Sequence, residues 1–569
     1  MMESSDILLT ILTCVFFMAL VAYISYLRTK GQVQSKEGYF LAGRSLSGVF
    51  IAGSLLLTNL SAEQLVGLNG SAYGFNMSSM AWEVTAGLAI VFMAIVLLPK
   101  YLKGAFTTLP EFLNSRFDHQ VRRLSVVLFM LGYGLITIPS VLYSGSIAVL
   151  RFFNVPELLD ISYSAALFVT ILTIGLIGAA YAIFGGLKAV AVSDTINGIG
   201  LLFIGLLVPV LGLVALGKGS FVAGFEVITS VDTHKLDAIG GEADPIPFGT
   251  IFTGMIFANL FYWGTNQYVI QRTLGAKNLK EGQKGVILSG YYKLLVPFMM
   301  MIPGTIAYHL YGESLASIDL AYPTLVKDLL PLYLSGFFLA VLLGAVFSSF
   351  NSLLNSAATM FVLDIYEPLS KQQLSENQLI KVAKISSIVI AVFSFIVAPL
   401  LQNAPNGLWE IIRVFTGFYN IPIIAVVLVG LFFKRVPAMG AKLAIVFHVI
   451  AYACFRFVFE LDIHYVHMYA VLFALDSLIM LAFGLFRPMD KSWQFVGSAD
   501  TVDMKPWKYA YPASFILLAA IVWLYLTFSP VGLAGNIGMT YWILTAATAA
   551  TAVLASLYSL RKYKQKYQD

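Results

Sequence analysis

Charged side chains are scarce in this chain of 569 residues. Asp, Glu, Lys and Arg make up only 11% of the sequence, whereas 59% of the residues are hydrophobic. A water-soluble domain usually carries about 25% charged residues. The composition therefore excludes a soluble protein and predicts a polytopic, all-α membrane protein.

Cysteine and catalytic motifs are also nearly absent. Cys14 and Cys454 are the only cysteines, and both fall inside apolar runs, which indicates core residues rather than a disulfide or a metal pair. The glycine pairs at 185–186 and 240–241 lack the spacing and strand context of a phosphate-binding loop. We find no Ser–His–acid or His-Glu-x-x-His arrangement, so we expect neither an ATP-driven pump nor an enzyme. We also expect no nucleic-acid partner.

Long apolar runs are what the sequence has in abundance. Fifteen runs are long enough to cross a membrane. The first lacks a basic start and a small-residue cleavage site, so we interpret it as a retained span. The runs lie near residues 7–27, 46–68, 80–99, 124–148, 163–182, 189–216, 250–271, 285–310, 333–361, 380–401, 408–433, 439–457, 465–486, 511–528 and 537–560.

The charges of the loops predict the orientation, because loops rich in Lys and Arg stay in the cytoplasm. Basic loops follow the first, third and seventh spans, and the last of them carries Arg272, Lys277, Lys280 and Lys284. The loop after the second span carries no charge, and the loop after the sixth is acidic. We therefore predict the N-terminus outside and the basic C-terminal tail in the cytoplasm, in agreement with an odd number of spans.

Polar residues interrupt the second and seventh spans at their middles. The second contains the run TNLSAEQ at 58–64, and the seventh contains ANLFYWGTNQ at 258–267. A charged side chain at the bilayer centre costs about 2.5–3.5 kcal/mol, so such residues usually line a cavity or bind a polar ligand. Interrupted helices at corresponding positions of two five-helix halves are typical of inverted-repeat transporters. The pattern predicts a solute site between the halves near the membrane midplane.

The ninth span carries a row of small and hydroxyl side chains. Ala345, Ser348, Ser349, Ser352 and Ser356 have the spacing of a single helical face. Close packing of membrane helices explains such a row without a ligand. Serine hydroxyls that face a broken helix are also suited to Na⁺, which exchanges its water for neutral oxygens.

Four ionisable residues lie within other apolar runs: Glu83, Asp194, Lys293 and Arg413. Such groups usually pair with one another or face water or a substrate. An internal ion pair without a ligand is the alternative for Glu83 and Lys293, and Glu410 lies one turn from Arg413. Near the C-terminus, we expect Arg456 to pair with Asp476 and His448 to be a packing residue.

Several short motifs recur in a known family. They are NLSAEQ at 59–64, TLPEF at 108–112, NLFYW at 259–263, NQYVIQRTL at 266–274, EGQKG at 281–285 and NSAAT at 355–359. In combination they resemble the sodium/glucose cotransporter branch of the solute:sodium symporter family. The resemblance runs from about residue 36 to about residue 435 and is strongest to bacterial members described only as probable sodium-dependent symporters.

The resemblance implies the leucine-transporter-type five-helix inverted repeat with extra flanking spans, in the bacterial inner membrane. The segments would be an extra N-terminal span at 1–45, a first repeat at 46–216, an extracellular loop at 217–249, a second repeat at 250–433 and extra C-terminal spans at 434–569. It also implies import of a hexose such as galactose or glucose, coupled to Na⁺ by alternating access, with no organic cofactor. The alternatives are an acidic sugar, a polyol or another organic anion, and more remotely a sodium-dependent sensor. The oligomeric state stays open.

The resemblance also implies the sodium ligands. They are the backbone carbonyls of Leu57, Leu60 and Ala345 and the hydroxyls of Ser348 and Ser349. Family members that move two Na⁺ use a further acid and hydroxyl groups, which correspond here to Asp194, Asn351 and Ser352. Both one and two sodium ions per cycle are compatible with the sequence.

The sugar site of the family corresponds to Asn59, Gln64, Glu83, Asn259 and Lys293, with Tyr262 stacking on the sugar ring. A carboxylate accepts hydroxyl protons, Lys donates, and Asn and Gln do both, which suits vicinal hydroxyls. The gate residues implied are Trp82, Trp263 and Trp409. Arg413 stands where sugar-transporting relatives have Gln, and a buried Arg suits an anionic substrate or an internal carboxylate. Glu63 matches its motif without an assigned ligand, and we expect a structural hydrogen bond there.

Overall fold

The computed structural model describes residues 4–29, 36–315, 317–370, 375–403, 408–459, 461, 463–494 and 502–567. These residues are almost entirely helical. In the described ranges the one pairing of β type is an isolated bridge between Leu46 and Ala276. The prediction of an all-α chain is therefore confirmed.

The predicted spans coincide with helical segments. Eleven described helices are long and apolar enough to cross a membrane, and two bent helix pairs raise the number to thirteen. The fifth and sixth predicted spans both lie in α12 (Tyr163–Leu216). The seventh is divided into α14 (Gly254–Gly264) and α15 (Gln267–Leu274), each too short to cross alone.

The remaining helices follow the order of the chain. The longer ones are α1 (Ser4–Thr29), α9 (His119–Gly132), α10 (Ile138–Phe153), α16 (Leu279–Lys293), α20 (Leu332–Met360), α22 (Glu376–Val397), α23 (Leu408–Phe432), α24 (Ala438–Phe457), α25 (Tyr465–Phe486), α26 (Ala510–Thr527) and α27 (Met539–Tyr567). The shorter ones are α2 (Lys36–Leu41), α5 (Met80–Val84), α6 (Ala86–Phe92), α7 (Leu98–Gly104), α8 (Leu109–Arg116), α11 (Val155–Leu159), α13 (Phe221–Ser230), α17 (Val296–Met300), α18 (Ile302–Tyr311), α19 (Ala321–Leu329) and α21 (Glu367–Leu369).

The second predicted span is broken at the polar run. Helices α3 (Gly48–Asn59) and α4 (Ala62–Gly74) meet at an angle of 58°. Leu60 has ψ 81°, and Ser61 is extended, so the helical hydrogen-bond ladder stops there. The last carbonyl groups of α3 therefore lose their partners in the following turn.

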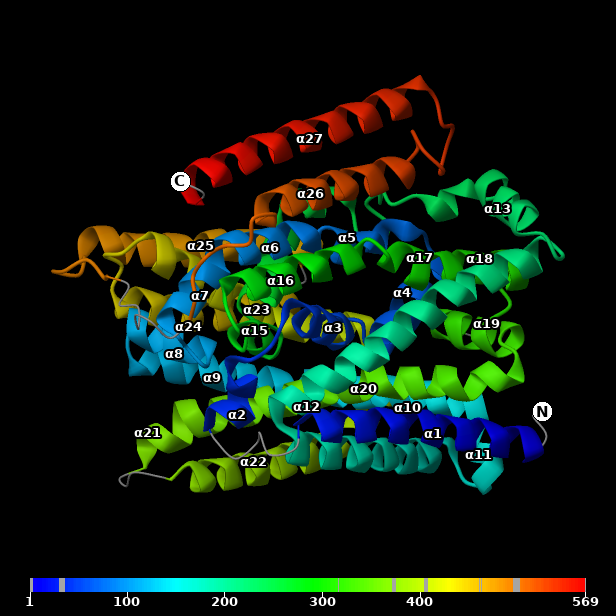
Figure 1. Ribbon diagram of the computed structural model, residues 1–569, viewed down its shortest axis with the longest axis horizontal. Helices are drawn as coiled ribbons and strands as arrows, with labels where there is room; N and C mark the ends of the chain where they lie inside the picture. The colour runs from blue at the N-terminus through cyan, green and yellow to red at the C-terminus, as the bar shows by residue number, and fades with distance from the viewer. Residues whose placement is uncertain are drawn as a thin grey trace.

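Helix α3 lies at the centre of the molecule, with α16 on one side and α12 and α20 on the other (Figure 1). Two glycines permit this close approach. A Cβ on Gly53 would lie 2.7 Å from Thr195 Oγ1 of α12, and a Cβ on Gly285 of α16 would lie 2.5 Å from Ile51 Cβ of α3. The break is thus wedged between helices of both predicted halves.

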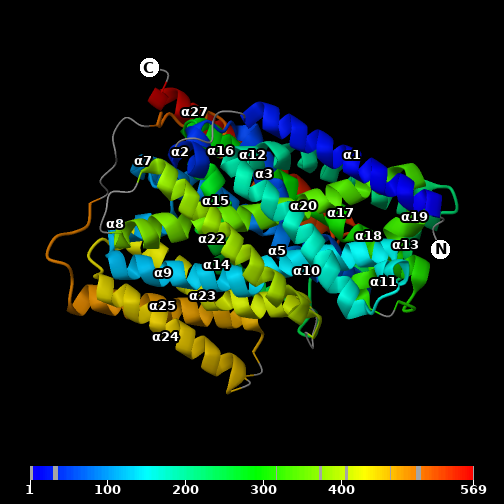
Figure 2. The same cartoon turned by 90° about the horizontal axis from the view of Figure 1, so that it is seen from below.

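The extra spans cover this centre from outside. Helix α1 lies in the lower right of Figure 1, and α26 and α27 lie at the top. Figure 2 shows α24 and α25 along a further side, next to α23. The start of α1 and the end of α27 lie at opposite ends of the molecule, as an odd number of spans requires. Which end faces outward stays a prediction.

The segment 217–249, predicted as a plain loop, is an ordered cover. It contains α13 and is bonded to the helices beneath it. Met77 donates its backbone N–H to the carbonyl of Asp237 at 3.0 Å, and Ala238 donates to the carbonyl of Phe528 at 2.7 Å. The buried Lys235 ammonium donates to the carbonyl of Tyr73 at 2.8 Å.

We expect Gly53→Ala to lower the thermal unfolding temperature of the purified protein. The added methyl group must displace Thr195 and part of the α12 backbone, and overpacking of this kind costs about 1–3 kcal/mol. Gly134→Ala is the matched control, because a Cβ at Gly134 meets no atom within 4 Å. Equal unfolding temperatures for the two variants would contradict the close packing of α3 against α12.

Candidate functional site

The serine face of α20 packs against the break between α3 and α4. Its five predicted residues are all buried, with exposed fractions of 0–2%. Ser349 Oγ lies 3.5 Å from the carbonyl oxygen of Leu57 and 3.4 Å from that of Thr58. Contacts of this length are weak hydrogen bonds. Ser348 lies one position before Ser349 on the same buried helix. The carbonyl oxygens at the break therefore accept only weak hydrogen bonds from the facing helix.

Two of the predicted sodium ligands, Leu57 and Ser349, are therefore in contact. Leu57 and Leu60 lie on the broken span, and Ala345, Ser348 and Ser349 lie on the facing helix, all of them buried. Oxygen ligands from neutral groups are what a dehydrated Na⁺ requires. The assignment of these five residues to a sodium ion stays a prediction.

Arg272 occupies the neighbourhood predicted for a second sodium ion. Its guanidinium donates to Ser352 Oγ and lies 3.8 Å from the Asp194 carboxylate. Asp194 also accepts a hydrogen bond from Ser54 at 2.6 Å. Asn351 is buried beside this group, but its side chain lines a different cavity.

The burial of Arg272 corrects the sequence analysis, which counted this residue among the charges of a basic loop. Arg272 is fully buried at the end of α15. The signal that identifies it is its place in the NQYVIQRTL motif, directly after the interrupted seventh span. A charge so close to a break is available to an internal partner, whereas loop charges normally remain in water.

One polar cavity brings together every predicted substrate residue. Glu83 comes from α5, Lys293 from α16 and Asn259 from α14, so the lining combines both predicted halves. The full lining is Asn59, Gln64, Trp82, Glu83, Ala258, Asn259, Tyr262, Trp263, Lys293, Arg413 and Asn420. Of the predicted gate residues, Trp82 and Trp263 are included, whereas the Trp409 side chain lies outside the residues that the structure describes.

A second cavity adjoins the first and connects it to the serine face. The two share Asn59, Gln64, Tyr262, Arg413 and Asn420. The second cavity is also lined by Ser349, Glu63 and Tyr268. Ser349, one of the five predicted sodium ligands, thus borders the same polar region as the predicted substrate residues.

An ion pair lies at the centre of the first cavity. The Lys293 ammonium contacts the Glu83 carboxylate and the side-chain oxygen of Asn59. Gln64 donates from Nε2 to Glu83 Oε1 at 3.1 Å. The internal pair considered in the sequence analysis is therefore present, and its members also line the cavity. Among the described residues that line it, Gln64 Oε1, Asn420 Oδ1 and Trp82 Nε1 have no hydrogen-bond partner, which leaves two acceptors and a donor for a ligand.

Tyrosines organise the interrupted helix α14–α15. Tyr262, predicted to stack on a sugar, accepts a hydrogen bond from the Tyr268 hydroxyl at 3.0 Å. Tyr133, in a π-helical turn between α9 and α10, donates to Asn266 at the break. π-helical turns often occur at functional sites because they aim a side chain out of register. Trp263 packs edge-on against Tyr262 with ring centroids 5.6 Å apart.

Arg413 lines both cavities from α23. Its guanidinium lies over the ring of Trp82, at 4.2 Å from the ring centroid. The arginine that the sequence analysis singled out therefore faces the same space as Glu83 and Lys293. Glu63, to which no ligand was assigned, lines the adjoining cavity, and its Oε2 makes no hydrogen bond.

Side chains from α24 and α25 hold the backbone of α23 next to Arg413. Tyr469 donates to the carbonyl of Arg413 at 2.8 Å, and Tyr452 donates to that of Val414 at 2.9 Å. His448 Nε2 lies 3.1 Å from the carbonyl of Gly417. The extra helices thus fix the segment of α23 that faces the cavity.

His448 also corrects an expectation. Its Nδ1 lies 2.8 Å from Asp476 Oδ2, so the buried carboxylate pairs with His448 rather than with Arg456. The carbonyl of Gly417 can only accept, so Nε2 of His448 carries a proton.

Comparison with known proteins identifies the family of the chain. The model of the sodium:solute symporter family matches residues 39–447. The chain is 45% identical over 518 residues to the uncharacterized symporter YidK of Escherichia coli (strain K12), covering 91% of this chain and 90% of that protein. It is 31% identical over 439 residues to the sodium/glucose cotransporter of Vibrio parahaemolyticus, covering 73% of this chain and 79% of the relative.

A solved structure shares the fold. It is a Na⁺-coupled sialic acid symporter in a substrate-bound, outward-open state, with a TM-score of 0.73 and 22% sequence identity. The match covers 84% of this chain and 98% of the other. The predicted fold class, a leucine-transporter-type inverted repeat with flanking spans, is confirmed. The exact residue boundaries of the two repeats stay a prediction.

We expect Glu83→Gln and Lys293→Met each to lower the thermal unfolding temperature strongly. Each leaves one buried charge uncompensated, which costs about 3–5 kcal/mol. The double variant removes both charges and should lose much less than the sum of the two single variants. Lys284→Met is the control, because its ion pair with Glu281 is partly exposed and contributes at most about 1 kcal/mol. Additive losses for Glu83 and Lys293 would contradict the pairing.

Proposed function

The chain belongs to the sodium:solute symporter family, and we propose that it imports a hexose, such as galactose or glucose, together with Na⁺ by alternating access. It is a membrane transporter and not an enzyme. The observation that carries the choice of a sugar is the cavity built around Glu83, Lys293 and Asn59.

The cavity offers the groups that a sugar needs. Vicinal hydroxyls are both donors and acceptors, and a carboxylate next to an ammonium can serve two of them at once. Hydrogen bonds to charged groups contribute about 1.5–3 kcal/mol each. Gln64 and Asn259 add amide groups, and Tyr262 and Trp263 add apolar ring faces. A sugar that enters would take over contacts that Lys293 now makes with Asn59 and Glu83.

Sodium is proposed to bind at the break of the second span. Its ligands would be the carbonyls of Leu57, Leu60 and Ala345 and the hydroxyls of Ser348 and Ser349. Na⁺ would fix the backbone at the break. It would thereby orient Asn59, which lies in the sequence between the proposed carbonyl ligands Leu57 and Leu60. By linkage, the sugar must then raise sodium affinity as much as sodium raises sugar affinity, typically by about 1–3 kcal/mol.

One sodium ion per cycle is the stoichiometry we propose. A second ion at Asp194, Asn351 and Ser352 would compete with Arg272, whose guanidinium already contacts Asp194 and Ser352. Repulsion between the guanidinium and Na⁺ disfavours simultaneous occupancy.

An acidic sugar is the second candidate substrate, and Arg413 favours it. The guanidinium lines both cavities and lies over Trp82. Arg binds carboxylates in a bidentate geometry that a neutral hexose does not need. The structural neighbour is described as a sialic acid symporter, whereas the Vibrio relative is named for glucose.

Uptake by purified protein in proteoliposomes should require an inward Na⁺ gradient, with a Hill coefficient for Na⁺ near one. Ser349→Ala should raise the Na⁺ concentration for half-maximal uptake about tenfold or more, because a lost ligand to a charged group costs about 1.5–3 kcal/mol. Ser387→Ala is the control, since this buried serine of α22 bonds only its own helix at the carbonyl of Ala383. An unchanged Na⁺ dependence in Ser349→Ala would refute the proposed ligand.

Competition of labelled galactose uptake should separate the two candidate substrates. If the substrate is a neutral hexose, glucose should compete, glucuronate and sialate should not, and Arg413→Gln should retain uptake. If the substrate is acidic, the acids should compete better, and Arg413→Gln should weaken their binding about tenfold or more, the value of a charge-assisted hydrogen bond. Glu83→Gln should impair uptake of a neutral hexose, and normal uptake in this variant would contradict the proposed sugar contact.

A further inference from the structure

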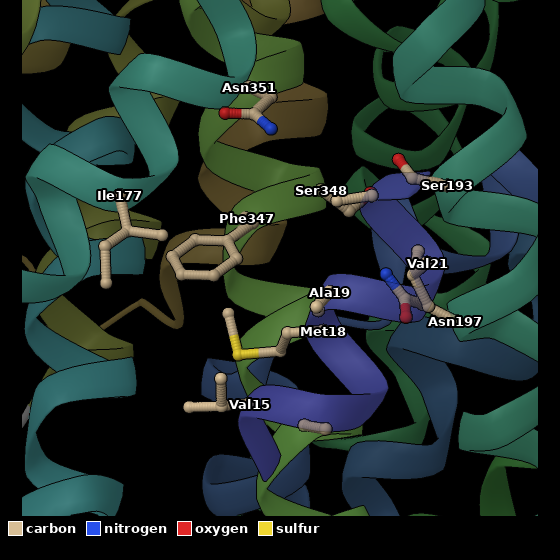
Figure 3. A pocket seen from close by; sticks show the side chains of 13 residues that line it. Val15, Met18, Ala19, Val21, Ile177, Ser193, Asn197, Phe347, Ser348 and Asn351 are labelled. Atoms are coloured by element: carbon tan, nitrogen blue, oxygen red, sulfur yellow. The ribbon is translucent and has the colours of Figure 1, made fainter. Parts of the chain in front are cut away.

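A cavity of a different character lies between α1, α12 and α20 (Figure 3). Its volume is about 330 Å³, at the lower end of the range for small-molecule pockets, which is about 300–1,000 Å³. On α20 it is lined by Gly344, Phe347, Ser348 and Asn351, whose spacing defines one helical face. Ser349, which borders the sugar cavity, points to another side of the same helix.

The mouth of this cavity opens toward the hydrocarbon region of the membrane. Val15 and Ile177 line it and are 56% and 49% exposed. Ala19 lines it as well and is exposed. Val15 and Ala19 lie near the middle of α1, a helix long and apolar enough to span the bilayer. A ligand therefore reaches the cavity from within the bilayer rather than from water.

The inner end of the cavity is polar and unsatisfied. Ser348 and Asn351 are only 2% and 1% exposed. Asn351 Oδ1 makes no hydrogen bond. Figure 3 shows the Asn351 amide at one end of the cavity and Val15 and Met18 at the other. A buried acceptor without a donor costs about 1–3 kcal/mol, so a ligand that supplies a hydroxyl there is stabilised.

We propose that this cavity binds one uncharged, single-chain amphiphile from the bilayer, such as a long-chain alcohol or a monoacylglycerol. Its hydroxyl group donates to Asn351 Oδ1 and contacts Ser348. Its chain runs along Met18 and Phe347 to the mouth at Val15. A charged head group is excluded because the mouth lies at mid-depth, where a charge is costly.

Asn351 distinguishes this site from the proposed sodium site. The one-sodium proposal uses Ser348 but leaves the Asn351 carbonyl without a role. Binding of the amphiphile needs neither Na⁺ nor sugar, so it is tested in their absence. Failure of either proposal leaves the other intact.

The experiment uses photoreactive octanols with a diazirine at carbon 3 or carbon 7, on the full chain in nanodiscs and in Na⁺-free buffer. Adducts are mapped by mass spectrometry. Saturable labelling is expected on residues 344–351 with the carbon 3 reagent and on residues 15–22 with the carbon 7 reagent. Unlabelled dodecanol should compete for both, and a photoreactive octane without the hydroxyl should label less.

Two variants test the lining. Ala19→Phe should abolish saturable labelling by filling the mouth, whereas Ala549→Phe, the same change at an exposed position of α27, should not. Asn351→Leu keeps the side-chain volume and should weaken labelling roughly 2- to 12-fold, the value of one neutral hydrogen bond. Labelling that is spread over exposed residues of α1 and α27, or that persists in Ala19→Phe, would overturn the proposal. Should Asn351→Leu fail to fold, Ala19→Phe alone decides.

Discussion

The helical ladder stops at Leu60, in the middle of a membrane span, and the rest of the structure is arranged around that break. No water is available in the bilayer core to bond the released carbonyl groups. The sequence therefore places hydroxyl groups opposite them, from a row of serines on α20. It also places glycines at positions 53 and 285, so that α12 and α16 can approach α3 closely. Neighbouring helices therefore pack around the break, and its backbone stays non-helical.

Buried charges connect the two predicted halves across this centre. Glu83 and Asp194 come from the first half, and their partners Lys293 and Arg272 come from the second. Each pair therefore lies where the halves must move against each other in alternating access. In the proposed mechanism, sodium and substrate contact these groups or their neighbours, and this contact would couple their binding to the movement of both halves. The pair of His448 and Asp476 differs, because it ties the extra helices to α23.

The sequence predicts those features that depend on chemistry along the chain. Apolar length gives the spans, and the polar run at 58–64 gives the break. Partner choice was harder to predict, because pairing depends on how distant helices pack. Asp476 was expected to pair with Arg456 but pairs with His448, and Arg272 was counted with a basic loop although it is buried. The cavity between α1, α12 and α20 could not be predicted from the sequence. The residues of α1 that line it are apolar, as on any helix that faces lipid.

The pairing of Glu83 with Lys293 and of Asp194 with Arg272 has an electrical consequence. Each pair sums to zero charge, so these four side chains add no net charge to the parts that move when the site is empty. A charge that crosses the full membrane potential gains or loses about 2.3 kcal/mol per 100 mV. In the proposed transport cycle, these four side chains therefore add little electrical work to the return of the empty carrier.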